Sequence, residues 1–389
     1  MVGDRFLVVG AGALGLASAE ALLQQGAEVT VLEQGAVGQE SSWAGGGILS
    51  PLCPWDYPAE VTQLTTRGAG LFGAWAENLH RATGIDPEYE TSGMLVLPPF
   101  DLSAAQSWCA EHGVKGALNK SVRGEYFPFA PSLDTAAPTW DEREMYRTTA
   151  FGLTQCPHKF APNDGSLLLP DVAQVRNPRL LQSLRARVEQ LGGRIIEHCE
   201  VKLLSVERGT VCKVMTSRGE FSAGGYVITA GAWSKQLLGA QALQLDIKPI
   251  RGQMLLFKFA APPLPHIVLQ DGLYLIPRRD GHLLVGSTLE DVGFDKSTTI
   301  DAREMLLQRA VAILPALRDM PPVKHWAGLR PGSTDNIPTI GRHPHLENLY
   351  INNGHFRYGV TMAPASVEVL LNEINGLSQP FDVSPYVWR

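Results

Sequence analysis

The sequence predicts an α/β fold, α+β overall, that is divided between two domains. Its 389 residues are more than one simple hydrophobic core accommodates. A strand, a glycine-rich turn, a helix and a second strand follow one another at the start of the chain, in the order of a parallel β-α-β unit. In the second half, the stretch 273–287 is strand-like on both sides of the turn Arg279-Asp280-Gly281, which is typical of an antiparallel hairpin.

Composition and charge restrict the classes of protein to which this chain can belong. Hydrophobic residues make up 44% and charged residues 19% of the chain, as in a globular protein with a sizeable core. The net charge of −6 gives no overall attraction to nucleic acid or an anionic membrane, so an anionic substrate needs a few local cations. We find neither a membrane-spanning apolar stretch nor a signal peptide. The five scattered cysteines indicate no disulfide framework and no metal site, and they favour a reduced, cytoplasmic protein.

The first 33 residues carry the strongest local signal. A short apolar strand, 6–9, runs directly into the motif Gly-Ala-Gly-Ala-Leu-Gly at 10–15, and a helix to about Gln25 follows. A second strand, 28–32, ends at Glu33. Glycine-rich turns are common, but a strand, this motif, a helix, a strand and an acid in this order are typical of a dinucleotide-binding unit.

Residues of this unit have distinct physical roles in binding a dinucleotide. Gly10 permits the tight turn, Gly12 lets a pyrophosphate approach the backbone, and Gly15 allows the helix to pack closely on the strand. The phosphates then lie at a helix N-terminus, where free N–H groups favour negative charge. Glu33 is placed to bind a ribose and would repel a 2′-phosphate, which argues against NADP. The unit therefore predicts a Rossmann-type domain for FAD or NAD.

Three later segments favour FAD over NAD. A second run of small residues, 38–51, leaves room for backbone close to a large, flat group. The apolar strand at 226–229 ends in Ala-Gly-Ala, which suggests backbone near the cofactor. The turn 354–359 precedes a helix over 360–375, whose N-terminus would stabilise the negative charge of a reduced flavin.

The chain resembles the D-amino-acid-oxidase-like family of FAD enzymes along nearly its whole length. Within that family it is similar to the glycine oxidases associated with thiamine biosynthesis. The order and combination of seven segments carry the resemblance: VVGAGALGLASAEALLQQGAEVTVLEQ, SSWAGGGILSP, VITAGAWS, PIRGQMLLF, LYLIPRRDGHLLVGSTLE, HWAGLRPGSTDNIPTIGRHP and GHFRYGVTMAPA.

The resemblance implies a discontinuous domain architecture. The FAD-binding domain would comprise residues 1–85, 155–235 and 325–389. The substrate-binding domain would comprise 86–154 and 236–324 and would be built on a mainly antiparallel sheet. The strand-like stretches 249–259 and 273–287 and a helix-like run, 301–313, agree with this second domain.

The resemblance also implies which residues bind the substrate. Arg330 matches the family's carboxylate-binding arginine, and a planar guanidinium suits a carboxylate. The alternative is that Arg330 is a charged residue of a surface loop. Tyr274 matches a tyrosine whose hydroxyl touches the same carboxylate, or it is an ordinary strand aromatic. Arg357 aligns with an arginine that lines the active site, or it holds local backbone. His355 is interpreted as a positioning residue, and no residue is assigned as a catalytic acid or base.

For the cofactor, the resemblance implies non-covalent FAD. No cysteine follows Cys212, so the cysteine linkage of some relatives is not expected; a histidine linkage is left open. Arg342 is placed either near the flavin or on the surface. The residues expected to bind FAD are Gly10, Gly12, Ala13, Leu14, Gly15, Glu33, Gln34, Ser41, Ser42, Gly46, Gly47, Ile48, Val201, His355, Phe356, Arg357, Tyr358, Gly359, Val360 and Thr361.

The implied reaction is oxidation of glycine to an imine and then to glyoxylate and ammonia, with oxygen reduced to hydrogen peroxide. The imine would supply thiamine thiazole synthesis. Sarcosine and small D-amino acids are further candidate substrates, a dehydrogenase using another electron acceptor is the alternative, and a non-catalytic flavoprotein is a third hypothesis. Met254 and Leu289 are either walls of a small pocket or ordinary strand core residues. The aromatic-rich segment 115–165 puts the substrate preference in doubt. The family also implies a homo-oligomer.

Overall fold

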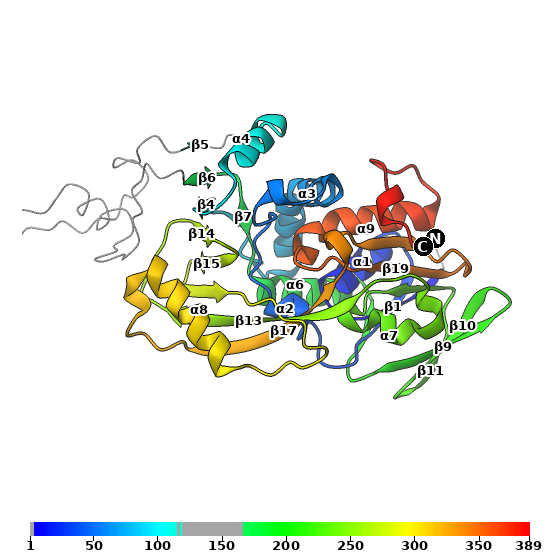
Figure 1. The fold of residues 1–389 in the computed structure, drawn as a ribbon. Coiled ribbons are helices and arrows are strands. Elements are labelled where there is room, and N and C mark those ends of the chain that lie inside the picture. Colours follow the sequence, from blue (N-terminus) through cyan, green and yellow to red (C-terminus); the bar gives the residue numbers. More distant parts are fainter. Residues whose placement is uncertain (1–3, 115–116, 119–165) are drawn as a thin grey trace, which may run out of the picture.

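The first of two large sheets is built around the N-terminal strand (Figure 1). The computed structural model describes residues 4–114, 117–118 and 166–389. The sheet is parallel except at one edge, where β18 runs antiparallel to β19. Its strands are, in spatial order, β18 (Thr339–Arg342), β19 (Leu349–Asn353), β12 (Gly225–Ile228), β1 (Arg5–Val9), β2 (Glu28–Leu32) and β8 (Arg194–Ile196). The central strands are apolar and buried because layers cover both faces of the sheet.

Helices form the layer on one face of this parallel sheet. Their buried apolar side chains pack together with alternate residues of the central strands in one core. The four helices are α1 (Ala13–Gln24), α3 (Ala59–Thr83), α6 (Asn177–Gln190) and α9 (Gly359–Asn375). The predicted helices after the glycine motif and over 360–375 are therefore confirmed.

A small antiparallel sheet and short helices cover the opposite face of the parallel sheet. They lie at the end of the molecule farthest from α8 (Figure 1). These elements are β9 (Val201–Glu207), β10 (Thr210–Thr216), β11 (Gly219–Phe221), α7 (Ser234–Leu238) and the 3-10 helices η2 (Gly231–Trp233) and η3 (Gly239–Ala242). A further 3-10 helix, η6 (Ser384–Tyr386), packs on the helical face instead, through the buried Tyr386. The parallel sheet is thus the middle one of three layers.

The second large sheet is antiparallel except for one parallel pair, β14 with β4. Its strands are, in spatial order, β17 (Lys324–Gly332), β13 (Lys248–Lys258), β16 (His282–Gly286), β15 (Leu273–Pro277), β14 (Ile267–Gln270), β4 (Met94–Leu97), β6 (Leu167–Leu169) and β5 (Ala117–Leu118). β15 and β16 flank the predicted turn at Arg279-Asp280-Gly281. With a parallel sheet and an antiparallel sheet in one chain, the predicted α/β class, α+β overall, is confirmed.

Each face of the antiparallel sheet packs against a different set of apolar residues. α8 (Ile300–Ile313) and η4 (Pro315–Leu317) cover one face. The other face, with Met254 and Tyr274, packs against residues near η1 (Pro54–Asp56) and α4 (Leu102–Glu111). The remaining elements are α2 (Ser41–Ala44), η5 (Thr334–Asn336) and the pair β3 (Glu90–Thr91) with β7 (Ala173–Gln174).

The pairing of β17 and β6 differs from the predicted domain boundaries. β17 pairs with β13 along its whole length, from Lys324 to Gly332, in the antiparallel sheet, although the predicted boundary of 325 places it with the cofactor domain. β6 pairs with β4 in the same sheet, although it follows residue 155. Both strands pair far from their sequence neighbours, which local pattern does not reveal. Apart from Ala117–Leu118 in β5, the segment 115–165 lies outside the described residues.

Within the described ranges, no helix combines the length and the apolar character that crossing a membrane requires. In the same part of the chain, no group of three or more His, Cys, Asp or Glu side chains is arranged to hold a metal ion.

Candidate active site

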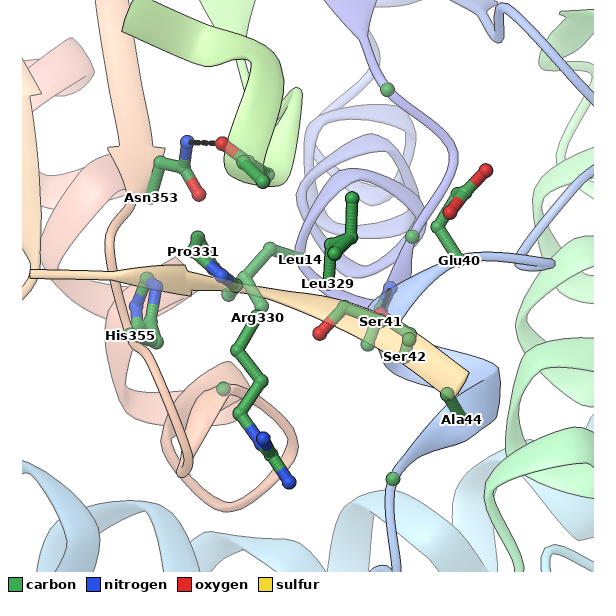
Figure 2. Close-up of a pocket in the computed structure, with 18 of the residues that line it drawn as sticks. Leu14, Glu40, Ser41, Ser42, Ala44, Leu329, Arg330, Pro331, Asn353 and His355 are labelled. Carbon is green, nitrogen blue, oxygen red and sulfur yellow. Dashed lines mark hydrogen bonds between the residues drawn. The ribbon is translucent and has the colours of Figure 1, made fainter. Parts of the chain in front are cut away.

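A cavity of about 890 Å³ lies where the glycine motif of the parallel sheet faces the antiparallel sheet. Its walls come from the start of α1, the 40–52 segment, β15, β17 and the turn into α9. Figure 2 shows Arg330 extending from β17 and His355 nearby, with Ser41 and Ser42 at α2. The cavity size is within the range for bound cofactors and ligands.

The predicted glycine motif forms one end of the cavity. Gly10 has φ +106°, and a Cβ there would lie 2.5 Å from the backbone oxygen of Thr229. At Gly15, a Cβ would lie 1.9 Å from the oxygen of Gly10, so only glycine allows α1 to approach the turn this closely. Ser42 accepts a hydrogen bond from the N–H of Ala13 at 2.9 Å, but Gly12, at the N-cap of α1, supplies no capping side chain. The start of α1 is thus suited to bind phosphate.

Glu33 lies beside the same turn. Its Oε2 accepts from the N–H of Ala11 at 2.8 Å and its Oε1 from the N–H of Gly35 at 2.9 Å. Burial raises the pKa of Glu33, although these two hydrogen bonds oppose the shift. The carboxylate is therefore held rigidly on the cavity wall, with lone pairs left for hydroxyl groups of a ribose. Val201, at the start of β9, also lines the cavity.

The second glycine run is held against β7 by close backbone contacts. Gly47 has φ +73°, and a Cβ there would lie 2.1 Å from the backbone oxygen of Val175. The buried Arg278 donates to the oxygen of Gly46 at 2.7 Å and to the oxygen of Val175 at 3.0 Å. Burial lowers the pKa of Arg278 to about 10. This arginine therefore fixes the glycine run, and the sequence analysis did not identify it.

The turn into α9 forms the opposite wall. Tyr358 is the N-cap of α9 and has no side-chain capping bond, so the N-terminus of this helix is open toward the cavity. Thr361 donates from its hydroxyl to the oxygen of Ile48 at 3.1 Å, which joins α9 to the second glycine run. His355 is buried, and its Nε2 lies 2.8 Å from the hydroxyl of Ser366. Burial lowers the pKa of His355 to about 3, so its imidazole is neutral near pH 7.

Arg330 reaches the cavity from β17. Its Nη2 donates to the hydroxyl of Ser287 at 2.6 Å and its Nη1 to the oxygen of Thr288 at 3.2 Å. Burial lowers the pKa of Arg330, while Tyr274 opposes this shift. Among the described residues, no carboxylate lies within ion-pair distance of this guanidinium. An arginine retains its charge even when buried, so it favours an anion in the cavity.

Arg357 is a second cation on the cavity wall. It lies among the tyrosines Tyr57, Tyr358 and Tyr274. Burial opposes its charge, but these tyrosines outweigh burial, and the pKa of Arg357 is raised. The two arginines come from different elements, the strand β17 and the turn before α9, and the fold brings them into one cavity.

The structure places most of the predicted residues on the cavity wall. Arg330, Tyr274, Arg357 and the expected FAD-binding residues other than Gly15 line it, and their binding roles stay predictions. Met254 also lines the cavity. Leu289 was a wrong choice, because it is 57% exposed in the loop after β16, where the strand alternation has ended. The side chain of Arg342 is 44% exposed and lies 3.8 Å from Glu373. Of the two predicted positions, near the flavin or on the surface, Arg342 therefore occupies the surface.

Several wall residues were missed in the sequence analysis. Asn177, at the start of α6, donates to the oxygen of Ser42 at 2.7 Å, and Asn353 donates to the oxygen of Gly231 at 2.8 Å (Figure 2). Trp233 and Phe294 form an aromatic pair with ring centroids 5.6 Å apart. Only Asn177 carried a signal in the sequence, because it is a polar residue at the start of a helix. The others depend on pairing between distant segments.

Cys53 is not suited to a covalent attachment. Burial raises the pKa of its thiol to about 12, with Asp56 contributing in the same direction. The thiol is therefore protonated near neutral pH and a poor nucleophile.

The glycine turn, two open helix N-termini and the long cavity define a protein that binds a dinucleotide cofactor beside a substrate pocket. The start of α1 fits such a group, because Gly12 at its N-cap carries no side chain and Gly12 and Glu33 both line the cavity. The family model described as FAD dependent oxidoreductase matches residues 5–372. The chain belongs to this D-amino-acid-oxidase-type family of FAD-dependent oxidoreductases, as the resemblance predicted, and its cofactor is FAD.

Individual relatives match almost the whole chain. A glycine oxidase of Pseudomonas aeruginosa is 41% identical over 384 residues, covering 98% of each chain. A protein of Synechocystis sp. named bifunctional protein ThiO/ThiG is 32% identical over 371 residues, covering 94% of this chain and 50% of that protein. The fold is similar to the crystal structure of a glycine oxidase from Geobacillus kaustophilus, with a TM-score of 0.86, 23% identity and 99% of both chains covered.

We predict that His355→Gln makes stability less sensitive to acid. The pKa of His355 is about 3 in the folded protein and near 6.5 when unfolded, so between these values the unfolded chain binds one more proton. The free energy of unfolding then falls as the pH falls, by up to about 1.4 kcal/mol per pH unit. Urea unfolding between about pH 6 and pH 4 should show a shallower slope for the variant. Equal slopes would contradict a buried, neutral His355.

Proposed function

We propose that the chain is an FAD-dependent glycine oxidase. It would convert glycine, oxygen and water to glyoxylate, ammonia and hydrogen peroxide. The observation that carries this proposal is the charged guanidinium of Arg330, which has neutral hydrogen-bond acceptors and faces the cavity between the second glycine run and the start of α9. The glycine oxidase relative, 41% identical over 98% of the chain, supports the choice of glycine.

In this proposal, FAD would supply the acceptor for a hydride, that is two electrons and one proton, from the Cα–H bond of the amino acid. Arg330 binds the substrate carboxylate, and Tyr274 lies beside it. Met254 and Tyr274 are both buried and line the cavity, so they restrict the room for a substrate side chain. The N-termini of α1 and α9 favour the negative charge of the phosphates and of the reduced cofactor, respectively.

The groups near Arg330 do not favour a protein base. His355 is neutral, but a pKa of about 3 makes it a weak proton acceptor near neutral pH. Burial holds the pKa of Tyr358 well above its usual value, so this hydroxyl stays protonated. With no such base to remove a proton from the substrate amine, the amine has to be neutral when it reacts. The protein's contribution is to bind and orient the amino acid.

The proposal is tested by following products for four substrates: glycine, sarcosine, D-alanine and D-proline. We expect glycine to give glyoxylate and hydrogen peroxide in equal amounts, with one oxygen consumed for each. Glyoxylate formed only with an added quinone or dye, and no peroxide, would instead identify a dehydrogenase. A preference for D-proline over glycine would show that the pocket is larger than proposed.

The setting of the enzyme is also part of the proposal. A reducing, cytoplasmic environment agrees with Cys53, Cys109, Cys199 and Cys212, which are all free. Supply of the glycine imine to thiamine thiazole synthesis is consistent with the ThiO/ThiG relative, half of which this chain matches. A homo-oligomer stays a prediction, to be tested by measuring the mass of the protein in solution.

A further inference from the structure

The loop that follows β16 contacts the outer part of the Arg330 guanidinium. Ser287 Oγ accepts from Nη2 at 2.6 Å, and the backbone oxygen of Thr288 accepts from Nη1 at 3.2 Å. A guanidinium has five N–H donors, so these two contacts leave donors for Tyr274 and for a ligand. Both acceptors are uncharged, so they fix the position of Arg330 without cancelling its charge.

Gly252 provides the space in which the guanidinium lies. A Cβ at this position would lie 2.1 Å from Nη1, 2.3 Å from Nη2 and 2.4 Å from Cζ of Arg330. Gly252 and Gly328 are register partners in the β13–β17 pair, two residues from Arg330 along β17. The guanidinium is therefore packed against the β13 backbone on one side and held by residues 287–288 through hydrogen bonds.

A buried polar network fixes residues 287–288 in turn. Thr288 Oγ1 accepts from the N–H of Gln253 at 2.8 Å and donates to Glu290 Oε1 at 2.5 Å. Glu290 also accepts from Gln253 Nε2 at 2.9 Å. The buried Arg251 forms an ion pair with Glu290 at 2.5 Å and exchanges two backbone hydrogen bonds with it. The position of Ser287 is thus determined before any ligand binds.

From this arrangement we infer that Ser287 is a positioning residue that sets both the geometry and the free charge of the carboxylate anchor. The inference rests on the proposed function in taking the ligand of Arg330 to be a carboxylate. A hydroxyl at position 287 holds one terminal nitrogen of Arg330 and leaves the positive charge for the substrate. Alanine would release that nitrogen, and aspartate would neutralise the guanidinium and repel a carboxylate.

The test compares two probes of nearly equal shape, acetate and acetamide, which differ in charge. Their dissociation constants are measured from the change in the visible flavin spectrum of the FAD-loaded protein. We expect wild-type protein to prefer acetate. Ser287→Ala should weaken acetate binding about tenfold and leave acetamide binding unchanged, because one hydrogen bond to the charged anchor is lost. Ser287→Asp should weaken acetate binding at least about a hundredfold.

Two further variants separate positioning from a general loss of structure. Ser287→Thr keeps the hydroxyl and should restore acetate binding to within a few-fold of wild type. Ser222→Ala, at an exposed position after β11, is the matched control and should bind both probes as wild type does. In steady-state assays with glycine, Ser287→Ala should raise KM by the same factor as the acetate constant and change kcat far less.

In the binding assay, three results would overturn the inference: a wild type without preference for acetate, an unchanged acetate constant in Ser287→Ala, or equal weakening of acetate and acetamide. Failure of the proposed function can be distinguished from failure of this inference. If wild type selects acetate through Ser287 but does not oxidise glycine, the anchor is correct and the substrate is wrong. If glycine is oxidised and Ser287→Ala keeps the wild-type KM, the function stands and the role of Ser287 is refuted.

Discussion

Arg330→Ala is expected to lower kcat/KM for glycine by roughly 30- to 5,000-fold, the equivalent of about 2–5 kcal/mol for the loss of one partner of a desolvated charge pair. The physical reason is that the guanidinium lines the cavity and donates its hydrogen bonds to the neutral acceptors of residues 287–288. Without it, the substrate carboxylate enters the cavity with one charge-assisted anchor missing. The measurement is steady-state oxygen consumption with varied glycine, and most of the loss should lie in KM.

Two comparisons make this result specific to the anchor. Arg330→Lys keeps a positive charge but loses the planar fork, so it should recover part of the activity. Arg342→Ala removes an arginine whose side chain is 44% exposed and only distantly paired with Glu373, and it should leave kcat/KM within about twofold of wild type. Glycine turnover that survives in Arg330→Ala at wild-type KM would refute the assignment of the carboxylate anchor.

Gly15→Ala is expected to yield protein that purifies without bound FAD. A Cβ at residue 15 would lie 1.9 Å from the backbone oxygen of Gly10 and 2.6 Å from the hydroxyl of Thr229. Thr229 donates from this hydroxyl to the oxygens of Val9 and Gly10, so the clash falls on the turn that faces the phosphates. Such overpacking costs about 1–3 kcal/mol of stability and moves the backbone. The visible flavin absorbance per protein and the urea midpoint are the two readouts.

Gly70→Ala is the matched control for this glycine. Gly70 lies inside α3, and a Cβ there would have no atom within 4 Å apart from its own chain neighbours and helix backbone. Alanine is the better helix former by about 1 kcal/mol, so this variant should keep its FAD and be at least as stable as wild type. A Gly15→Ala protein with a full complement of FAD would show that close packing at residue 15 is not required for the cofactor.

Local pattern predicted those parts of the fold and cavity that depend on neighbouring residues. The motif from Gly10 to Gly15 requires particular backbone conformations, and the strand before it is a short apolar run. The start of α9 was found in the same way, from a glycine-containing turn before an amphipathic helix. Arg330 and Tyr274 came instead from the family resemblance, and the structure brings both to one cavity.

The residues that sequence reasoning missed depend on contacts between distant segments. Arg278 lies one residue after β15, next to other arginines, and only the fold shows that it reaches the backbone of Gly46 and Val175. Ser287 lies at the end of an ordinary strand, and its contact with Arg330 depends on the pairing of β13 with both β16 and β17. Leu289 was misplaced because it was considered a pocket wall or strand core residue, whereas β16 ends at Gly286 and Leu289 is exposed.

The most direct test of the proposed function is anaerobic reduction of the bound FAD by glycine. In the absence of oxygen, glycine should bleach the oxidised flavin spectrum completely, and admitting oxygen should restore it with one hydrogen peroxide formed per flavin. Flavin that stays oxidised at high glycine concentration, in protein with a full complement of FAD, would contradict the account.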